Sequence, residues 1–185
     1  MLEAALALYE ARGHEGFTVH AIAEASDVSL GSLYHHFGSV DGISAALYVR
    51  CMDRLMSSLV ADVERTKTAK TGIVALARAY LAFTSDHSAE ARFIHASSYA
   101  TFLPTHAGAI QSAKAGSLAR LQRWLEPHVR SGEIVDLAPP LFEMLVIGPV
   151  AETARRWLAG GQHGIDLGEA TRVLPDRIWR SVAVR

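Results

Sequence analysis

Apolar residues recur at intervals of three and four along almost the whole chain of 185 residues, which is the spacing that lines one face of an α-helix. Leu2, Leu6 and Tyr9 form the first of these faces. No segment alternates apolar and polar residues cleanly with the period of two that a half-buried β-strand requires, and the three residues that begin at Thr18 come nearest to it. The pattern therefore predicts an all-α fold.

Glycine, proline and hydroxyl residues divide this pattern into separate helices. We expect a first helix that ends near Gly13 or Gly16, a short helix capped by Thr18, and a second short helix through Leu33 to His36. A long helix follows, capped by Ser39 and unbroken to about Val63, and further helices are expected at about 71–86, 89–102, 105–130, 140–159 and 168–182. Pro149 should kink its helix, and Pro175 either kinks the last helix or starts a new segment.

The balance of charge and the cysteine content exclude several classes of protein. The chain has eighteen Lys and Arg residues and nineteen Asp and Glu residues. It therefore lacks the net positive charge by which strongly basic proteins bind nucleic acid. The single cysteine, Cys51, forms no internal disulfide, and no Cys/His pair has zinc-finger spacing. The longest uncharged stretch, residues 93–113, is too polar to span a membrane, and the N-terminus lacks the pattern of a signal peptide. We expect a cytoplasmic protein.

The segment from Thr18 to Phe37 meets the three demands of a helix-turn-helix. Ala23 is small where two helices would cross, and Asp27 tolerates a left-handed turn. The apolar residues Ile22, Val28 and Leu33 are spaced to lock the angle between the helices. The second helix would then present small and polar side chains to a major groove of DNA: Ser29, Leu30, Gly31, Ser32, Tyr34 and His35.

Several short motifs occur in a fixed order in the first 40 residues. They are Ala-Ala-Leu-Ala-Leu-Tyr from Ala4, Thr-Val-x-x-Ile-Ala from Thr18, Val-Ser from Val28, Gly-Ser-Leu-Tyr-His-His-Phe from Gly31, and Ser-Val from Ser39. In this order and spacing they resemble the N-terminal signature of the TetR/AcrR family of bacterial transcriptional regulators. The similarity covers about the first 50 residues, and the remaining chain resembles the family only in length, helicity and an apolar C-terminal end.

The resemblance implies a role for each matching residue. Thr18 and Tyr34 would contact DNA phosphates, and Phe37 would be a packing residue. Ser29, Leu30, Gly31, Ser32 and His35 would lie at or near base edges. The chain departs from the family at Val40, where a lysine usually contacts phosphate, and at its start, where Leu2 already stands on the first helix and no basic arm precedes it.

By the same resemblance, residues 1–46 would form a three-helix DNA-binding domain and residues 47–185 a larger helical bundle for effector binding and dimerisation. Aromatic and polarisable residues that would surround an effector pocket are Tyr80, Phe83, His87, Phe93, His95, Tyr99, Phe102, Trp124 and Met144. The alternative is that most of them are bundle core. If the pocket exists, the residues that line it suit a largely apolar ligand with one or two hydrogen-bonding groups.

The last two expected helices are more apolar than one bundle of this size needs. Burial between two copies of the chain would explain the surplus, and in the family the last two helices pair as a four-helix interface. The residues expected there are Ala154, Trp157, Leu158, Val173, Ile178, Trp179 and Val182. The alternative is that both helices are core of the monomer.

Motifs for catalysis, cofactors and metals are missing from the sequence. There is no Gly-x-Ser-x-Gly, no Gly-x-Gly-x-x-Gly and no His-Glu-x-x-His, so we expect neither an enzyme nor a bound cofactor or metal. The leading hypothesis is a homodimeric, ligand-responsive repressor that binds a near-palindromic operator. Its rivals are a helical dimerisation or interaction scaffold with a helix-turn-helix that binds no DNA, and a small helical-bundle enzyme or carrier.

The charge is unevenly distributed along the chain. Residues 1–50 hold two arginines and six carboxylates, a net charge of −4, while the remainder carries +3. Contact with DNA would then depend on helix N-termini, hydroxyls and protonated His35 or His36. This predicts a weak dependence of DNA affinity on salt, and an affinity that rises as pH falls toward about 6.

Overall fold

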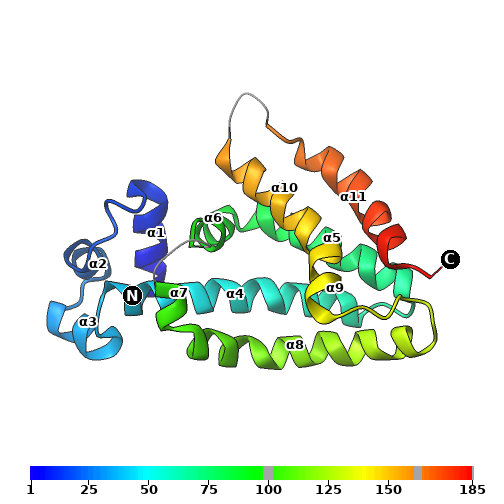
Figure 1. The fold of residues 1–185 in the computed structure, drawn as a ribbon. Helices are drawn as coiled ribbons and strands as arrows, with labels where there is room; N and C mark the ends of the chain where they lie inside the picture. The colour runs from blue at the N-terminus through cyan, green and yellow to red at the C-terminus, as the bar shows by residue number, and fades with distance from the viewer. Residues whose placement is uncertain (98–101, 161–163, 185) are drawn as a thin grey trace. The chain divides into compact units, whose positions relative to one another are not determined.

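The computed structural model describes residues 1–97, 102–160 and 164–184, and in these ranges it contains helices and no strand (Figure 1). The predicted all-α fold is confirmed. The helices are α1 (Leu2–Arg12), α2 (Val19–Ser26), α3 (Leu30–Phe37), α4 (Val40–Glu64), α5 (Ala69–Asp86), α6 (Ser88–Ala96), α7 (Phe102–Thr105), α8 (Ala107–Arg130), α9 (Pro139–Val146), α10 (Gly148–Ala159) and α11 (Leu167–Val182). Within the described ranges, none of them is long and apolar enough to cross a membrane.

Hydroxyl side chains start each of the three helices that follow α1. The Thr18 hydroxyl accepts a hydrogen bond from the Ala21 N–H at 3.2 Å, and the Ser29 hydroxyl accepts one from the Ser32 N–H at 3.1 Å. Ser39 caps α4 in the same way. Each bond satisfies one of the backbone donors that a helix leaves unpaired at its N-terminus. The caps predicted at Thr18 and Ser39 are confirmed, and the structure adds Ser29 as the cap of α3.

The chain forms two compact units. Unit 1 comprises Met1–Asp53 and Ala89–Lys114, and unit 2 comprises Arg54–Ser88 and Ala115–Arg185. The helix-turn-helix segment thus shares a unit with α6 and α7, while α4 and α8 each contribute to both units. A functional boundary between residues 46 and 47 remains a prediction.

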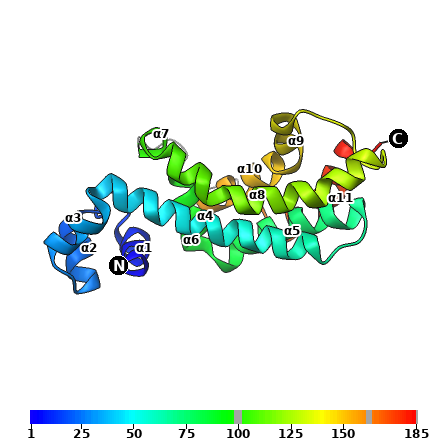
Figure 2. The same ribbon diagram turned by 90° about the horizontal axis from the view of Figure 1, so that it is seen from below.

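In unit 1, α2 packs against both α1 and α3, and the three short helices lie together (Figure 2). Ile22 of α2 is fully buried, and Leu33 of α3 and Ile43 of α4 are each 1% exposed. An ion pair of 2.8 Å joins Arg50 of α4 to Glu3 of α1 at the surface. Because the core residues come from α2, α3 and α4, burial of apolar area holds the helix-turn-helix to the start of the long helix.

In unit 2, α10 and α11 pack against α5, and α9 packs against both α10 and α11 (Figure 1). The centre of this unit is apolar, with Ile73 of α5 and Val150 of α10 both fully buried. Arg120 of α8 forms a two-pronged ion pair with Glu64 at the end of α4, one bond of which measures 2.8 Å. Its hydrogen bonds to the carboxylate lower the pKa of Glu64.

Prolines affect the C-terminal helices differently. The segment predicted as one kinked helix at 140–159 is divided at Ile147 into α9 and α10, two residues before Pro149, which has no N–H to continue the helical hydrogen bonding. Pro175 lies inside α11, which continues through it. Of the helix expected at 89–102, α6 covers the part up to Ala96 and α7 begins at Phe102, while residues 98–101 lie outside the described residues.

The end of α11 is joined to the turn that follows α8. The Val135 N–H donates to the Val182 carbonyl at 2.9 Å, and the Val184 N–H donates to the Glu133 carbonyl at 3.1 Å. These bonds flank an isolated antiparallel bridge. The backbone just after the last helix is therefore held by a segment nearly fifty residues earlier in the chain.

We predict opposite effects for two glycine-to-alanine substitutions in helices. A Cβ at Gly72 of α5 would stand 1.9 Å from a ring carbon of Trp124, so Gly72→Ala should lower the free energy of unfolding by about 1–3 kcal/mol. A Cβ at Gly116 of α8 would meet no atom within 4 Å, so Gly116→Ala should raise it by about 0.5–1 kcal/mol. Urea unfolding of both variants measures the difference. Equal effects would contradict the packing of Trp124 on Gly72.

Candidate nucleic-acid interface

A left-handed residue makes the turn between α2 and α3. Asp27 has φ 52° and ψ 45°, and its N–H is directed to the Ala23 and Glu24 carbonyls at the end of α2. The Val28 N–H also donates to the Ala23 carbonyl, at 3.2 Å. This is the turn geometry that the sequence predicted for Asp27, and it gives α3 a defined direction as it leaves α2.

One side of α3 is buried and the other is open to solvent. Leu33 is 1% exposed, while the next residue, Tyr34, is 51% exposed. Of the other residues predicted to contact DNA, Thr18, Ser29, Gly31 and His35 are exposed, and Leu30 and Ser32 are partly exposed. Six of the seven thus lie on α3 or at its N-cap, and Thr18 lies at the N-cap of α2.

The caps leave hydrogen-bonding capacity for a ligand. Thr18 and Ser29 use a hydroxyl oxygen to accept a bond from their own helix, so each hydroxyl hydrogen is still available to donate. The exposed phenol of Tyr34 is a further donor. Phosphate oxygens are acceptors that such hydroxyls and helix N-termini bind in protein–DNA complexes.

Positive charge is scarce on this surface. The sequence has no Lys or Arg between Arg12 and Arg50, and Arg50 is paired with Glu3. Glu24 and Asp27, which flank the turn, are both exposed. Any affinity for DNA must therefore come from hydroxyls, backbone N–H groups and histidines rather than from a row of cations.

A close contact sets the corner between α3 and α4. A Cβ at Gly42 would lie 1.8 Å from the carbonyl oxygen of Phe37, so only glycine lets the backbone of α4 approach the end of α3 this closely. Gly38, between the two helices, has φ 74°. Sequence reasoning missed the role of Gly42, for which the available signal was a glycine inside an otherwise helical pattern.

The residues predicted for an effector region fall in both units. In unit 2, Tyr80 and Phe83 are buried in α5, and the His87 ring lies 5.1 Å from that of Phe83. Trp124 packs on α5, and Met144 of α9 is 68% exposed. A common effector pocket formed by these five side chains remains a prediction.

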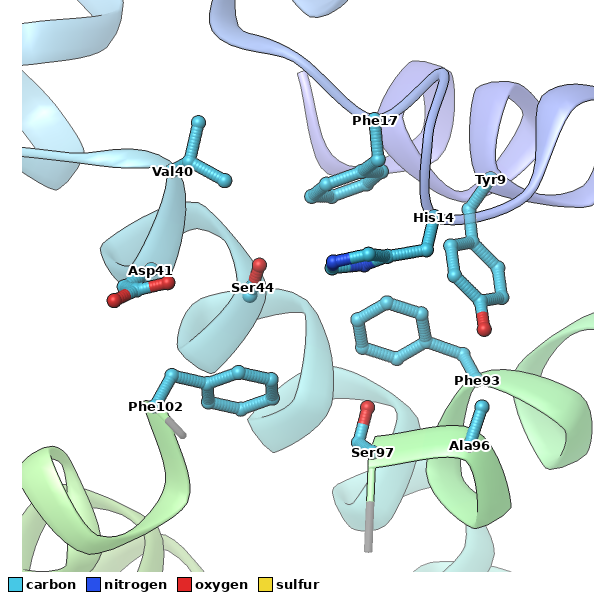
Figure 3. A pocket seen from close by; sticks show the side chains of 10 residues that line it. All are labelled: Tyr9, His14, Phe17, Val40, Asp41, Ser44, Phe93, Ala96, Ser97 and Phe102. Atoms are coloured by element: carbon cyan, nitrogen blue, oxygen red, sulfur yellow. The ribbon is translucent and has the colours of Figure 1, made fainter. Parts of the chain in front are cut away.

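In unit 1, Phe93 of α6 and Phe102 of α7 are buried, and both line a pocket of about 430 Å³ (Figure 3). His95 is partly exposed on α6, and Tyr99 lies outside the described residues. The other walls of the pocket come from α1, the loop after it, and the first turn of α4. Sequence reasoning missed those walls because they are far from α6 in the sequence.

The residues predicted for a dimer interface differ in exposure. Four of them are buried inside unit 2: Ala154, Leu158, Ile178 and Val182. Trp157 and Trp179 are partly exposed, and Val173 is 43% exposed.

A second apolar face, which sequence reasoning missed, lies on α9. Leu141, Met144 and Leu145 are 53%, 68% and 37% exposed, and their spacing of three and four places them on one face of the helix. We call these three residues the α9 face.

In the ranges that the structure covers, no group of three or more His, Cys, Asp or Glu side chains is placed to hold a metal ion.

A capped helix-turn-helix with an exposed second helix is the arrangement in which helix-turn-helix domains place a recognition helix in the major groove of DNA. Residues 1–47 match a family sequence model described as "Bacterial regulatory proteins, tetR family". The resemblance to the TetR family noted in the sequence is thereby confirmed for this segment. No curated protein matches the chain.

Solved structures share the fold over nearly the full length. A TetR family transcription regulator from Marinobacter aquaeolei VT8 is 20% identical with a TM-score of 0.75, covering 100% of this chain and 94% of the other. Transcriptional regulator FadR from Bacillus subtilis, in complex with stearoyl-CoA, is 20% identical with a TM-score of 0.75 and coverage of 96% and 95%. Ketosteroid regulator KstR2 of Mycobacterium tuberculosis is 20% identical with a TM-score of 0.65 and coverage of 100% and 93%. The fold is that of TetR-family regulators, and these neighbours are regulators rather than enzymes.

We predict that the turn tolerates glycine and rejects a β-branched residue. Asp27→Gly should leave the free energy of unfolding unchanged or raise it, because glycine adopts positive φ without strain. Asp27→Val should lower it by about 1–2 kcal/mol. Urea unfolding compares the two, and equal stability would mean that residue 27 is not held in the left-handed region.

Proposed function

We propose that this protein is a ligand-responsive transcriptional repressor that binds a near-palindromic operator as a homodimer. The observation that carries the proposal is the surface of α3. It is held by buried Leu33 and by the left-handed turn at Asp27, and it presents exposed Ser29, Gly31 and Tyr34. The family match over residues 1–47 supports the same reading.

In this proposal α3 enters a major groove with its N-terminal end toward the bases. Ser29, Gly31 and Ser32 are small, so the helix backbone can approach the base edges closely. Thr18 and Tyr34 hold phosphates on either side. Two copies would read half-sites whose centres lie about 34–36 Å apart.

The dimer would form through α10, α11 and the α9 face, all in unit 2. Exposed Val173 and partly exposed Trp157 and Trp179 supply apolar area on the last two helices, which pair in the family that the sequence resembles. The α9 face adds three exposed apolar side chains on a neighbouring helix. Burial of these residues against a second copy is the arrangement that would remove them from water.

An effector would act through α4, which is one continuous helix from the corner beside α3 to Glu64. A ligand that favours one position of α4 over another would change the separation of the two recognition helices, and hence operator affinity. The effector is proposed to be largely apolar. The stearoyl-CoA complex of FadR and the ketosteroid regulator KstR2 support an apolar effector by analogy.

One observation favours a different function. The first 50 residues carry a net charge of −4, which suits a scaffold whose helix-turn-helix contacts protein rather than DNA. The two functions separate in a direct test of binding to DNA fragments from upstream of the protein's own gene. An intact dimer that binds none of them at low salt would favour the scaffold.

We predict that two substitutions on α3 have different effects on DNA binding. Tyr34→Ala should weaken binding about tenfold on every sequence, because a phosphate contact carries no base information. Ser32→Ala should change the preferred base at one position of each half-site and leave the others unaltered. Fluorescence anisotropy with a panel of single-base operator variants measures both.

Lys67→Ala is the matched control for these variants, since Lys67 is an exposed cation in the turn before α5. It should leave DNA affinity unchanged. If Tyr34→Ala and Lys67→Ala have the same effect, the proposed docking of α3 is wrong.

We predict that a charge on the α9 face disrupts the dimer. Met144→Glu should raise the dimer dissociation constant at least about tenfold, because it would bury an unpaired carboxylate against the second copy. Glu126→Gln on α8, another exposed position, is the control and should leave it unchanged. Sedimentation equilibrium gives the constants, and an unaffected dimer in Met144→Glu would place the interface elsewhere.

A further inference from the structure

The pocket in unit 1 is walled by elements from two parts of the sequence. One wall comes from α1, the loop after it and the first turn of α4, which belong to the helix-turn-helix region. The other wall comes from the end of α6 and the start of α7. Its volume of about 430 Å³ lies within the range of small-molecule sites. A molecule bound there would touch the DNA-reading part of the chain directly.

Aromatic rings make up much of the lining (Figure 3). Tyr9 meets Phe93 edge to face, with ring centroids 4.9 Å apart and planes at 85°. Phe17 lies 6.0 Å from Tyr9 and 6.1 Å from Phe93. Phe102 also lines the pocket, and its ring centroid lies 6.2 Å from that of Tyr48. These rings offer an apolar site whose π faces also attract cations.

Five polar side chains line the pocket, and two of them, Asp41 and Ser44, lie on α4. Asp41 carries the negative charge of the lining, and the Ser44 hydroxyl is one turn further along the helix. None of the ten described residues that line the pocket is Lys or Arg; His14 is the one basic side chain among them. Arg92 is close enough to Tyr9 to lower its pKa, against the larger rise that burial causes. Figure 3 places Tyr9 and Asp41 at opposite ends of the pocket.

We infer that this pocket binds a compact lipophilic amine, with its apolar body among the rings and its protonated nitrogen at the Asp41 end. A cation there gains from the carboxylate and from the face of Phe102. The same unit already contains such a pairing, since the Lys114 ammonium lies 5.7 Å from the centre of the Tyr48 ring.

The lining disfavours an acid or a phosphate-bearing ligand. A ligand carboxylate at the same end would be repelled by the carboxylate of Asp41. The partial positive charge at the N-terminus of α4 is already balanced by Asp41, so it would not attract a second anion. Phosphate groups are held in proteins by Arg, Lys or free helix N-termini, and the lining supplies no Arg or Lys side chain. The pocket is thus unlike one for an acyl-CoA.

The regulatory part of this inference rests on the proposed function. A molecule in the pocket contacts α1 and α4 on one side and α6 on the other, so it would favour one arrangement of these helices. The amine is therefore an effector that changes operator affinity by acting next to the helix-turn-helix.

The test uses three molecules with one ring system and different head groups: naphthylmethylamine, naphthylmethanol and naphthoate. Isothermal titration calorimetry with the full chain, without DNA, measures each affinity. We expect the amine to bind about tenfold more tightly than the alcohol, and the naphthoate to bind most weakly. Equal affinities for amine and alcohol, or no binding of any of the three, would overturn the inference.

Two pairs of variants locate the site and its charge. Ala96→Trp fills the pocket from an exposed position and should abolish amine binding, while Ala109→Trp, on the exposed surface of α8, should not. Asp41→Asn should weaken amine binding about fivefold and leave the alcohol unchanged, while Asp53→Asn, exposed further along α4, should alter neither. Binding retained in Ala96→Trp would place the site elsewhere and overturn the assignment.

A separate measurement addresses regulation. If the protein binds its operator, saturating amine should change operator affinity at least about fivefold in the parent chain and not in Ala96→Trp. An unchanged operator affinity with amine bound would overturn the effector role and leave the binding site standing. Failure to bind any operator would instead overturn the proposed function, and calorimetry would still decide the amine site.

Discussion

The contact of Phe93 with Tyr9 and Phe17 is the interaction on which unit 1 depends. Three short helices of about forty residues bury little apolar surface, and chains of that size rarely fold without further support. Phe93 supplies that support from α6, with both rings within about 6 Å. The position of α3 depends in part on this, because buried Leu33 of α3 belongs to the apolar core of the same unit.

The surface presented by α3 relies on shape and hydrogen bonding more than on charge. Attraction to the phosphate backbone is mostly independent of sequence, and it comes from Lys and Arg that residues 13–49 lack. What remains are hydroxyls, backbone N–H groups and histidines, and the uncharged hydroxyls and N–H groups act only at short range. If α3 binds DNA as proposed, weak binding to random DNA would contribute to its selectivity as much as strong specific contacts would.

Local features of this fold were predictable from sequence, and contacts between distant segments were not. Thr18, Ser29 and Ser39 as caps, Asp27 as the turn and Pro149 as a helix breaker each follow from the chemistry of one residue and its neighbours. The pocket was missed because its walls are joined by packing of Phe93 on α1. For Ala154 and Ile178, the sequence could not distinguish burial in the core of one chain from burial in a dimer interface. Periodicity identifies an apolar face of a helix, but it does not identify the surface that packs against it.

The two hydrogen bonds between the segment after α11 and the turn after α8 alter how the end of this chain should behave. Final residues usually fray, and their amides exchange with solvent rapidly. Here the Val184 and Val135 amides both donate across one antiparallel bridge, which joins the two segments. The last helix and the α8–α9 turn would exchange as a single cooperative unit, which makes the C-terminal end part of the slow-exchanging body of unit 2.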